Sequence, residues 1–260
     1  MTTAEPSALH VTGLRKSFGG VRVLQDFELT IPARSQAAVA ILGQNGAGKT
    51  TLLNLITRLI PADAGQIEVF GHDVLAAGAR HLAGFGVART FQSPRLLLDE
   101  TCLSNVVLGA QSLRRGRDGG TDAATRRATQ ALDRVGLAAQ AGRVAGTLPF
   151  GSRKLVELAR ALALQPRLLL LDEPAAGLSD LEESRLAVVL TGLTDTGITL
   201  LLIEHRMALV AATAGRVVMM DGGAIVFDGD TAGAIASPLV RERYLGAGFD
   251  QASPEGSERA

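Results

Sequence analysis

The sequence predicts an α/β fold with a mainly parallel core sheet, and three observations lead to this prediction. Three runs are almost entirely apolar, as expected for strands buried on both faces: residues 37–42, 168–171 and 199–203. A glycine-rich stretch over residues 43–48 follows the first run and leads into a segment with helical spacing of its apolar residues. Further helical segments separate the later runs. Strands that alternate with helices are typical of α/β proteins with a parallel sheet.

The composition argues against several other classes of protein. The chain has 260 residues, with 26 Lys or Arg and 26 Asp or Glu, and 47% of its residues are hydrophobic. This hydrophobic content is too high for a disordered chain, and the balanced charge argues against a protein whose main partner is nucleic acid. Cys102 is the single cysteine, so no internal disulfide can form. Since no apolar run is long enough to cross a membrane and no signal-peptide pattern is present, we expect a soluble protein on the cytoplasmic side.

Short strands are expected near both ends of the chain. Residues 9–31 combine β-favouring residues with turns, including a strand at 21–24, and residues 66–70 form another candidate strand. Two late strands, 217–220 and 224–227, flank an Asp-Gly-Gly turn.

The middle of the chain is expected to form a helical subdomain over about residues 93–165, with a basic loop at 114–120. Another helix begins at Ser179, because Ser179-x-x-Glu182 matches a capping box. We expect a single domain over residues 8–248. Flexible ends are expected at residues 1–7 and 249–260.

Residues 43–50, with the sequence GQNGAGKT, match the phosphate-binding loop pattern G-x-x-x-x-G-K-[ST]. A predicted strand precedes the loop and a predicted helix over Thr50–Leu59 follows it. Glycines let successive N–H groups point at phosphate oxygens, and a helix N-terminus favours negative charge. We expect Lys49 to reach the β- and γ-phosphates and the Thr50 hydroxyl to bind Mg²⁺. The alternative is a chance glycine-rich turn, which the strand, the lysine and the threonine together argue against.

Two carboxylates follow the second apolar run, in the sequence LLLLDEP over residues 168–174. Asp172 is expected to hold Mg²⁺ through a water molecule. Glu173 is expected to orient and polarise an attacking water, a contribution of about 10²- to 10⁴-fold in rate. The alternative is a strand end with two solvated acids, which the phosphate loop upstream disfavours.

With these motifs the chain resembles the ATP-binding subunits of ABC (ATP-binding cassette) transporters, from about Leu9 to Leu245. The resemblance implies a P-loop NTPase fold with an antiparallel β subdomain, and ATP hydrolysis with ATP and Mg²⁺ as cofactors. It makes Phe18 the aromatic residue that stacks on adenine, a contact worth about 1–3 kcal/mol, and an ordinary half-buried Phe is the alternative. The nucleotide-binding residues that it implies are Phe18, Val23, Gly43, Gln44, Asn45, Gly46, Ala47, Gly48, Lys49, Thr50 and Thr51.

The resemblance also assigns two residues near the γ-phosphate. Gln92, in the sequence ARTFQ, is similar to the Q-loop glutamine that contacts Mg²⁺ and the attacking water. His205, which follows the last buried strand, is similar to the switch histidine of the family. A surface glutamine and a structural histidine are the alternatives, and the flanking residues argue against them. The implied catalytic residues are Glu173, His205 and Gln92, and the implied Mg²⁺ ligands are Thr50, Gln92 and Asp172.

Residues 148–152 resemble the family signature, usually Leu-Ser-Gly-Gly-Gln, which contacts ATP held by a partner subunit. Pro149 has neither a hydroxyl nor an N–H, so a hydrogen bond worth about 1.5–3 kcal/mol is lost there. Gly151 and the following helix still offer backbone donors, and a hydroxyl from Ser152 is a further expectation. The signature residues are Leu148, Pro149, Phe150, Gly151 and Ser152, and those of the D-loop at the dimer interface are Gly177, Leu178, Ser179 and Asp180.

Finer features are similar to the LivG-type ATPases of branched-chain amino-acid importers: the ARTFQ segment, the Leu-Pro-aromatic-Gly signature, Ile203-Glu204-His205 and the ending Tyr244-Leu245-Gly246. This branch implies a second ATPase subunit, with a heterodimer favoured over a homodimer. It also implies two membrane permeases and an external solute-binding protein, and no nucleic acid. The chain would then lie at the cytoplasmic face of the membrane as a peripheral subunit, with a permease helix in the groove near residues 92–105.

Two other functions are alternatives. The first is an ABC ATPase of DNA repair or translation, which the neutral charge and the lack of long inserts disfavour. The second is a regulatory subunit that binds ATP and hydrolyses it poorly. Pro149 favours the second alternative, whereas Glu173 and His205 argue against it. A P-loop enzyme of another family, such as a kinase, is disfavoured by Gln92, His205 and the signature segment.

Overall fold

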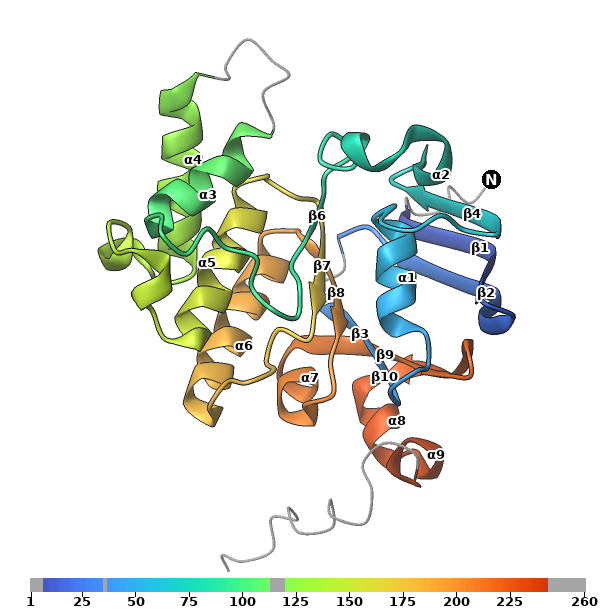
Figure 1. Cartoon of the computed structure of the whole chain (residues 1–260). Helices are drawn as coiled ribbons and strands as arrows, with labels where there is room; N and C mark the ends of the chain where they lie inside the picture. Colours follow the sequence, from blue (N-terminus) through green and yellow to red (C-terminus); the bar gives the residue numbers. More distant parts are fainter. Residues whose placement is uncertain (1–6, 35–36, 113–119, 243–260) are drawn as a thin grey trace, which may run out of the picture.

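The computed structural model describes residues 7–34, 37–112 and 120–242, and its larger sheet has the order β10-β9-β3-β8-β7-β6 (Figure 1). Strand β10 is antiparallel to β9, and all other neighbours in this sheet are parallel. The predicted parallel core sheet is therefore confirmed. Its strands are β3 (Ala38–Gly43), β6 (Val87–Arg89), β7 (Leu168–Asp172), β8 (Thr199–Ile203), β9 (Ala214–Asp221) and β10 (Ala224–Asp230).

A second, antiparallel sheet has the order β2-β1-β4-β5. Its second strand extends well beyond the predicted residues 21–24, because burial of alternate apolar side chains continues through Phe27, Leu29 and Ile31. The strands are β1 (Ser7–Phe18), β2 (Val21–Pro32), β4 (Ala64–Val69) and β5 (His72–Asp73).

Helices cover the core sheet, and α3, α4 and α5 form a separate lobe on the left of Figure 1. Helix α1 lies between the two sheets, with Leu52, Leu53 and Ile56 fully buried. The helices are α1 (Lys49–Ile56), α2 (Val74–Ala77), α3 (Cys102–Gln111), α4 (Thr121–Arg134), α5 (Phe150–Leu162), α6 (Asp180–Asp195), α7 (Met207–Thr213), α8 (Thr231–Ala236) and α9 (Pro238–Val240), with 3₁₀ turns at Ala79–His81, Ala138–Gln140 and Ala145–Thr147.

The helical lobe begins later than the sequence predicted. Residues 93–101 form a loop, because the buried side chain of Asn105 hydrogen-bonds to backbone groups that a helix would use. The N–H of Leu97 donates to Oδ1 of Asn105 at 2.8 Å, and Nδ2 of Asn105 donates to the carbonyl oxygen of Leu97 at 2.9 Å. The predicted basic loop at 114–120 and the predicted flexible ends fall almost entirely outside the described residues, although Ser7 is the first residue of β1.

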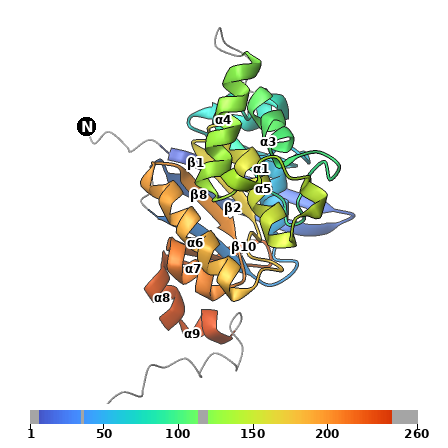
Figure 2. The same ribbon diagram turned by 90° about the vertical axis from the view of Figure 1, so that its left-hand side faces the viewer.

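The core sheet separates two hydrophobic clusters. Along β3, Val39 and Ile41 face the cluster that includes α1 and the antiparallel sheet, whereas Ala40 and Leu42 face the cluster that includes the helical lobe, α6 and α7. The same alternation occurs in β7 and β8, which explains why all three sequences are continuously apolar. Figure 2 shows α6 and α7 on this second side of the sheet.

Helix α6 begins as the sequence predicted. Ser179 is its N-cap, and the reciprocal hydrogen bonds of a capping box join Ser179 and Glu182. Across residues 7–34, 37–112 and 120–242, no helix has both the length and the apolar character needed to cross a membrane.

Candidate functional site

Glycines shape the loop between β3 and α1. Gly46 and Gly48 have φ angles of 87° and 99°, in the left-handed region that residues with a side chain disfavour. A Cβ atom at Gly48 would lie 3.0 Å from the carbonyl oxygen of Val23, so β2 packs directly against the loop and leaves no space for a side chain there. Residues 44–46 are exposed, and Ala47 is buried beneath them. The backbone therefore curls into a turn whose outer side is open to a ligand.

Lys49 lies inside this curl and is only 9% exposed. Its Nζ donates to the carbonyl oxygens of Gly43 at 2.6 Å and Gln44 at 2.9 Å. Burial lowers the pKa of Lys49, and the nearby carboxylates of Glu173 and Asp172 oppose that shift. The loop thus wraps around an ammonium group that faces two acids.

The remaining predicted nucleotide-binding residues lie around this loop. Thr50 is exposed in the first turn of α1, and Thr51 is half-buried behind it. Phe18 ends β1 with 47% of its surface exposed, and Nζ of Lys16 lies 5.1 Å from its ring centroid. Val23 is half-buried in β2. The ring of Phe18 is therefore free to receive a planar ligand group.

Strand β7 ends in the two predicted acids. Asp172 is buried, and Oδ2 accepts a hydrogen bond from Nη2 of Arg89 at 2.8 Å. Glu173 has a φ of 48°, a left-handed conformation that costs of order 1–3 kcal/mol for a residue other than glycine. Its N–H donates to the carbonyl oxygen of Ile203 at 2.9 Å, so β8 holds the strained turn in place.

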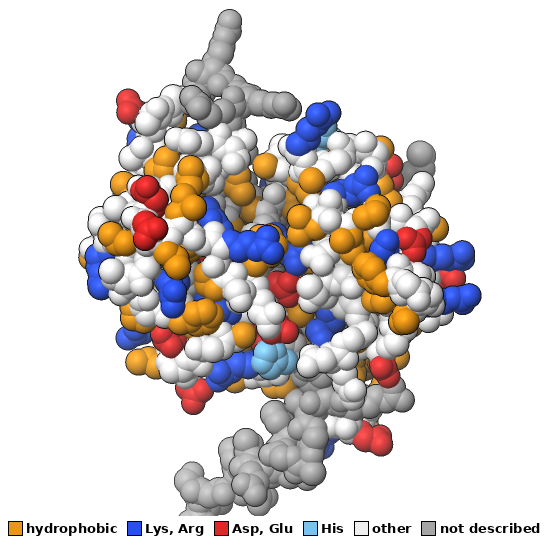
Figure 3. Space-filling model, viewed as in Figure 1, with side chains coloured by type: hydrophobic (Ala, Val, Ile, Leu, Met, Phe, Trp, Pro, Cys, Tyr) orange, Lys and Arg blue, Asp and Glu red, His pale blue; other side chains and the backbone are white. Residues whose placement is uncertain are grey.

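The three predicted catalytic residues meet at the carboxyl ends of neighbouring parallel strands. Nε2 of Gln92 donates to Oε2 of Glu173 at 2.7 Å, and Nδ1 of His205 lies 3.9 Å from the same oxygen. This edge is where ligands bind in parallel α/β sheets. The molecular face in Figure 3 is hollowed between the two lobes, and basic, acidic and histidine side chains gather along the hollow.

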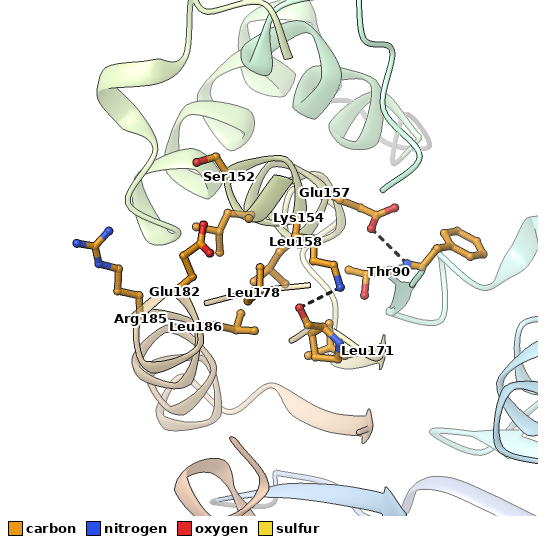
Figure 4. A pocket seen from close by; sticks show the side chains of 14 residues that line it. Thr90, Ser152, Lys154, Glu157, Leu158, Leu171, Leu178, Glu182, Arg185 and Leu186 are labelled. Atoms are coloured by element: carbon orange, nitrogen blue, oxygen red, sulfur yellow. Dashed lines mark hydrogen bonds between the residues drawn. The ribbon is translucent and has the colours of Figure 1, made fainter. Parts of the chain in front are cut away.

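Helix α5 is tied to the loops on both sides of it by residues that the sequence did not single out. Nζ of Lys154 donates to the carbonyl oxygen of Glu173 at 2.7 Å, and the carboxylate of Glu157 accepts from the N–H groups of Phe91 and Arg95 at 3.3 and 3.0 Å. Burial lowers the pKa of Lys154 and raises that of Glu157. Figure 4 shows both side chains beside a cavity of about 80 Å³ between α5, α6 and the segment after β6.

Glu204 is a further residue that sequence reasoning missed. It is fully buried, and its carboxylate accepts hydrogen bonds from the N–H groups of Ala175, His205 and Arg206 at 2.7, 2.8 and 3.0 Å. A carboxylate directly before the predicted histidine was visible in the sequence. Its partners were not, because Ala175 is 29 positions away along the chain.

The predicted signature segment, residues 148–152, leads into α5, which begins at Phe150. Pro149 is the N-cap residue and makes no side-chain capping bond. Phe150 lies against the predicted D-loop, since a Cβ atom at Gly177 would lie 3.0 Å from its ring. Of the five residues, two are buried (Leu148 and Gly151), one is half-buried (Ser152) and two are exposed (Pro149 and Phe150).

The predicted D-loop, residues 177–180, is anchored by the segment that follows the predicted switch histidine. Arg206 donates through Nη1 to the carbonyl oxygen of Leu178 at 2.9 Å and through Nη2 to Oδ1 of Asp180 at 2.7 Å. The D-loop, the Glu173 turn and His205 therefore form one connected unit.

The oxygen atoms of the side chains at this site are of the kind that bind a magnesium ion. Mg²⁺ prefers oxygen ligands and is usually held by one or two carboxylates together with substrate phosphates and water. The exposed hydroxyl of Thr50, the carboxylate of Asp172 and the amide oxygen of Gln92 supply such atoms. Among the described residues there is no group of three or more His, Cys, Asp or Glu that could hold a metal ion.

Comparison with known proteins identifies the relatives of this chain. Residues 24–176 match the ABC transporter family. The chain is 34% identical over 250 residues to the high-affinity branched-chain amino acid transport ATP-binding protein BraF of Pseudomonas aeruginosa, and equally to LivG of Escherichia coli K12. In both cases the alignment covers 92% of this chain and 97% of the relative.

Solved structures show the same relationship. A nucleotide-free ATP-binding cassette from an ABC transporter superposes with a TM-score of 0.82 at 28% identity, over 92% of this chain and 98% of the other. The ADP conformation of MJ1267, an ATP-binding cassette of an ABC transporter, gives a TM-score of 0.80 at 30% identity, over 92% and 99%. The chain therefore belongs to the ABC transporter family and is an ATPase cassette of that family.

Proposed function

We propose that this chain hydrolyses Mg·ATP with Glu173 as its general base and thereby powers import of branched-chain or related amino acids. The observation that carries the proposal is the convergence of Gln92 and His205 on one carboxylate oxygen of Glu173. In this proposal residues 43–51 hold the phosphates and Phe18 and Val23 hold the adenine. A water molecule beside Glu173 then lies next to the phosphate loop.

The chemistry follows from these positions. Glu173 accepts a proton from the water as the water oxygen bonds to the γ-phosphorus, and the bond from that phosphorus to the β,γ-bridging oxygen breaks. The electron pair leaves with ADP. Lys49 and His205 stabilise the charge on the γ-phosphate oxygens. Mg²⁺, when bound by Thr50 and, through water, by Asp172, supplies positive charge beside the phosphates.

Gln92 has a dual position in this scheme. It contacts Glu173 directly, and the segment that carries it is bonded to α5 through Glu157. A change at the γ-phosphate is thereby linked to the helical lobe. This connection supports a role for Gln92 in both water placement and movement of the lobe.

A second ATPase subunit is expected to complete each site. Residues 148–152 lead into α5 in the helical lobe, and the family resemblance implies that this signature serves ATP held by a partner. Pro149 provides no hydroxyl for that contact, so both ATP sites of a homodimer would lack it. We therefore favour a heterodimer with a cassette of different sequence, as the resemblance to the branch implies. The D-loop at residues 177–180 would line the same interface.

The transported solute is proposed from the relatives. Both BraF and LivG are named as branched-chain amino acid transport proteins, and each aligns over nearly its whole length. We place the chain at the cytoplasmic face of the membrane, on two permeases fed by an external solute-binding protein. Leu97 and Leu98, which are 52% and 46% exposed, offer apolar surface to a permease helix. Residues 8–248 would act as one ATPase domain.

The central test is Glu173→Gln. We expect this variant to bind Mg·ATP as the wild type does and to hydrolyse it about 10²-fold or more slowly in a single turnover. Cells of the source organism in which this variant replaces the wild-type protein should no longer take up labelled leucine. Glu28→Gln changes an exposed carboxylate on β2 and serves as the matched control, with hydrolysis and uptake unchanged.

Each outcome addresses a different part of the proposal. Unchanged hydrolysis in Glu173→Gln would remove this residue from its role as base. Lost hydrolysis with normal leucine uptake would leave the ATPase assignment standing and overturn the assignment of the transported solute.

A further inference from the structure

Arg89 connects three elements around the phosphate site. It ends β6, and its side chain is only 5% exposed. Nη1 donates to Oδ1 of Asn54 at 2.7 Å and to Oγ1 of Thr57 at 3.0 Å, while Nη2 donates to Oδ2 of Asp172 at 2.8 Å. One planar group therefore joins the end of β7 to α1 and its C-cap, and the first turn of α1 carries Thr50.

This arrangement is specific in its geometry. The guanidinium presents donors in a rigid fork, whereas a lysine ammonium acts as a point charge. Nε of Arg89 is buried without a hydrogen-bond partner. All three side-chain hydrogen bonds of the guanidinium are therefore made by Nη1 and Nη2. Within the described residues, Oδ1 of Asp172 accepts no recorded hydrogen bond. The fork thus occupies one carboxylate oxygen and leaves the other available.

We propose that Arg89 is a positioning residue for the metal of the ATPase reaction: it fixes the orientation of Asp172 relative to α1, so that Oδ1 and the Thr50 hydroxyl present a preset pair of oxygen sites to Mg²⁺. This inference rests on the proposed function. Groups that orient metal-binding side chains typically contribute 10- to 100-fold to metal affinity, so the effect is large enough to measure by binding.

The experiment measures ATP affinity by calorimetry over a series of Mg²⁺ concentrations and again in EDTA, with the full chain in a Glu173→Gln background so that nucleotide is not consumed. In Arg89→Lys, which keeps the charge and loses the fork, we expect the half-saturating Mg²⁺ concentration to rise about tenfold. ATP affinity in EDTA should stay within about twofold, because the fork donates to Asn54, Thr57 and Asp172 and to none of residues 43–51. Thermal melts without nucleotide report on folding.

Two further variants make the result decisive. Asn54→Ala leaves the pair between Arg89 and Asp172 intact and removes one anchor of the fork, so we expect a rise of about threefold; this variant also tests the proposal if Arg89→Lys does not fold. Arg216→Lys alters another arginine pair, with Asp228 at 2.6 Å on β9 and β10, and should leave the Mg²⁺ dependence unchanged.

The proposal is overturned if Arg89→Lys weakens ATP binding equally with and without Mg²⁺, which would indicate a purely structural role, or if the Mg²⁺ dependence does not change. If the nucleotide-binding part of the proposed function is wrong, the result differs, because the Glu173→Gln parent would then show no Mg²⁺-dependent ATP binding. Failure of the general-base role or of the transported solute would appear in hydrolysis and uptake and would leave this binding experiment unchanged.

Discussion

Glu204 holds the predicted D-loop segment and the predicted switch-histidine segment with a single side chain. Its carboxylate is buried and accepts three backbone N–H groups, one from Ala175, two residues before the predicted D-loop, and two from His205 and Arg206. A buried carboxylate is stable only when it is well hydrogen-bonded, and here the backbone supplies the donors. The backbone of His205 is therefore held by the side chain of the residue before it.

We expect Glu204→Ala to lower the free energy of unfolding by about 3 kcal/mol, because buried donors that lose a charged acceptor each cost about 1–3 kcal/mol and water can satisfy only some of them. Glu182→Ala is the matched comparison, since Glu182 also accepts a backbone N–H, from Ser179 at 2.9 Å, but in an exposed capping box. There the loss should be about 0.5–1 kcal/mol. Urea unfolding measures both, and equal losses would contradict the role of burial.

At the scale of elements, α5 bonds to the turn that carries Glu173 and to the segment that carries Gln92. Lys154 and Glu157 lie one turn apart on this helix and reach these two loops. Helix neighbours at i and i+3 share a face, so a single face of α5 contacts both loops. A tilt of this helix would therefore move Glu173 and Gln92 together.

Glu157 gives this element a pH dependence. Burial raises its pKa above the ordinary value of 4.5, so the folded state favours the protonated form more than the unfolded state does. Relative to Glu157→Gln, which does not titrate, the wild type should be most stable below about pH 4.5 and should lose that advantage as pH rises through the raised pKa. Urea unfolding of both proteins between about pH 4.5 and pH 8 checks this. If the wild type instead gains stability relative to Glu157→Gln as the pH rises, the hydrogen bonds from Phe91 and Arg95 outweigh the effect of burial on the Glu157 pKa.

The sequence predicted the elements whose signals are local. The phosphate loop and the capping box at Ser179 are encoded within eight residues or fewer, and apolar strands buried on both faces leave a continuous pattern. It did not reveal Arg89 as the partner of Asp172, because these residues are 83 positions apart and neither flanking sequence carries the pairing. The loop at 93–101 was missed for a similar reason, since a single buried Asn105 decides it.

At the scale of the whole molecule, one sheet belongs to two cores. Strands β3, β7 and β8 place alternate side chains in the cluster with α1 and in the cluster with the helical lobe. The same strands end at the phosphate loop, the two acids and the predicted switch histidine. Nucleotide binding at this edge, as proposed, would therefore act on the elements that hold both cores together.

Binding of Mg·ATP should consequently stabilise the entire chain. A ligand at about 100 times its dissociation constant adds about 2.7 kcal/mol to the stability of the folded state, which for a chain of this size corresponds to a rise of about 5–10 °C in Tm. Lys49→Ala should abolish the rise, because it removes the buried ammonium group that the loop encloses. Arg126→Ala, on the exposed side of α4, should preserve it. Differential scanning calorimetry with Glu173→Gln as the parent prevents hydrolysis during the scan, and an equal rise in Lys49→Ala would place the nucleotide somewhere other than this loop.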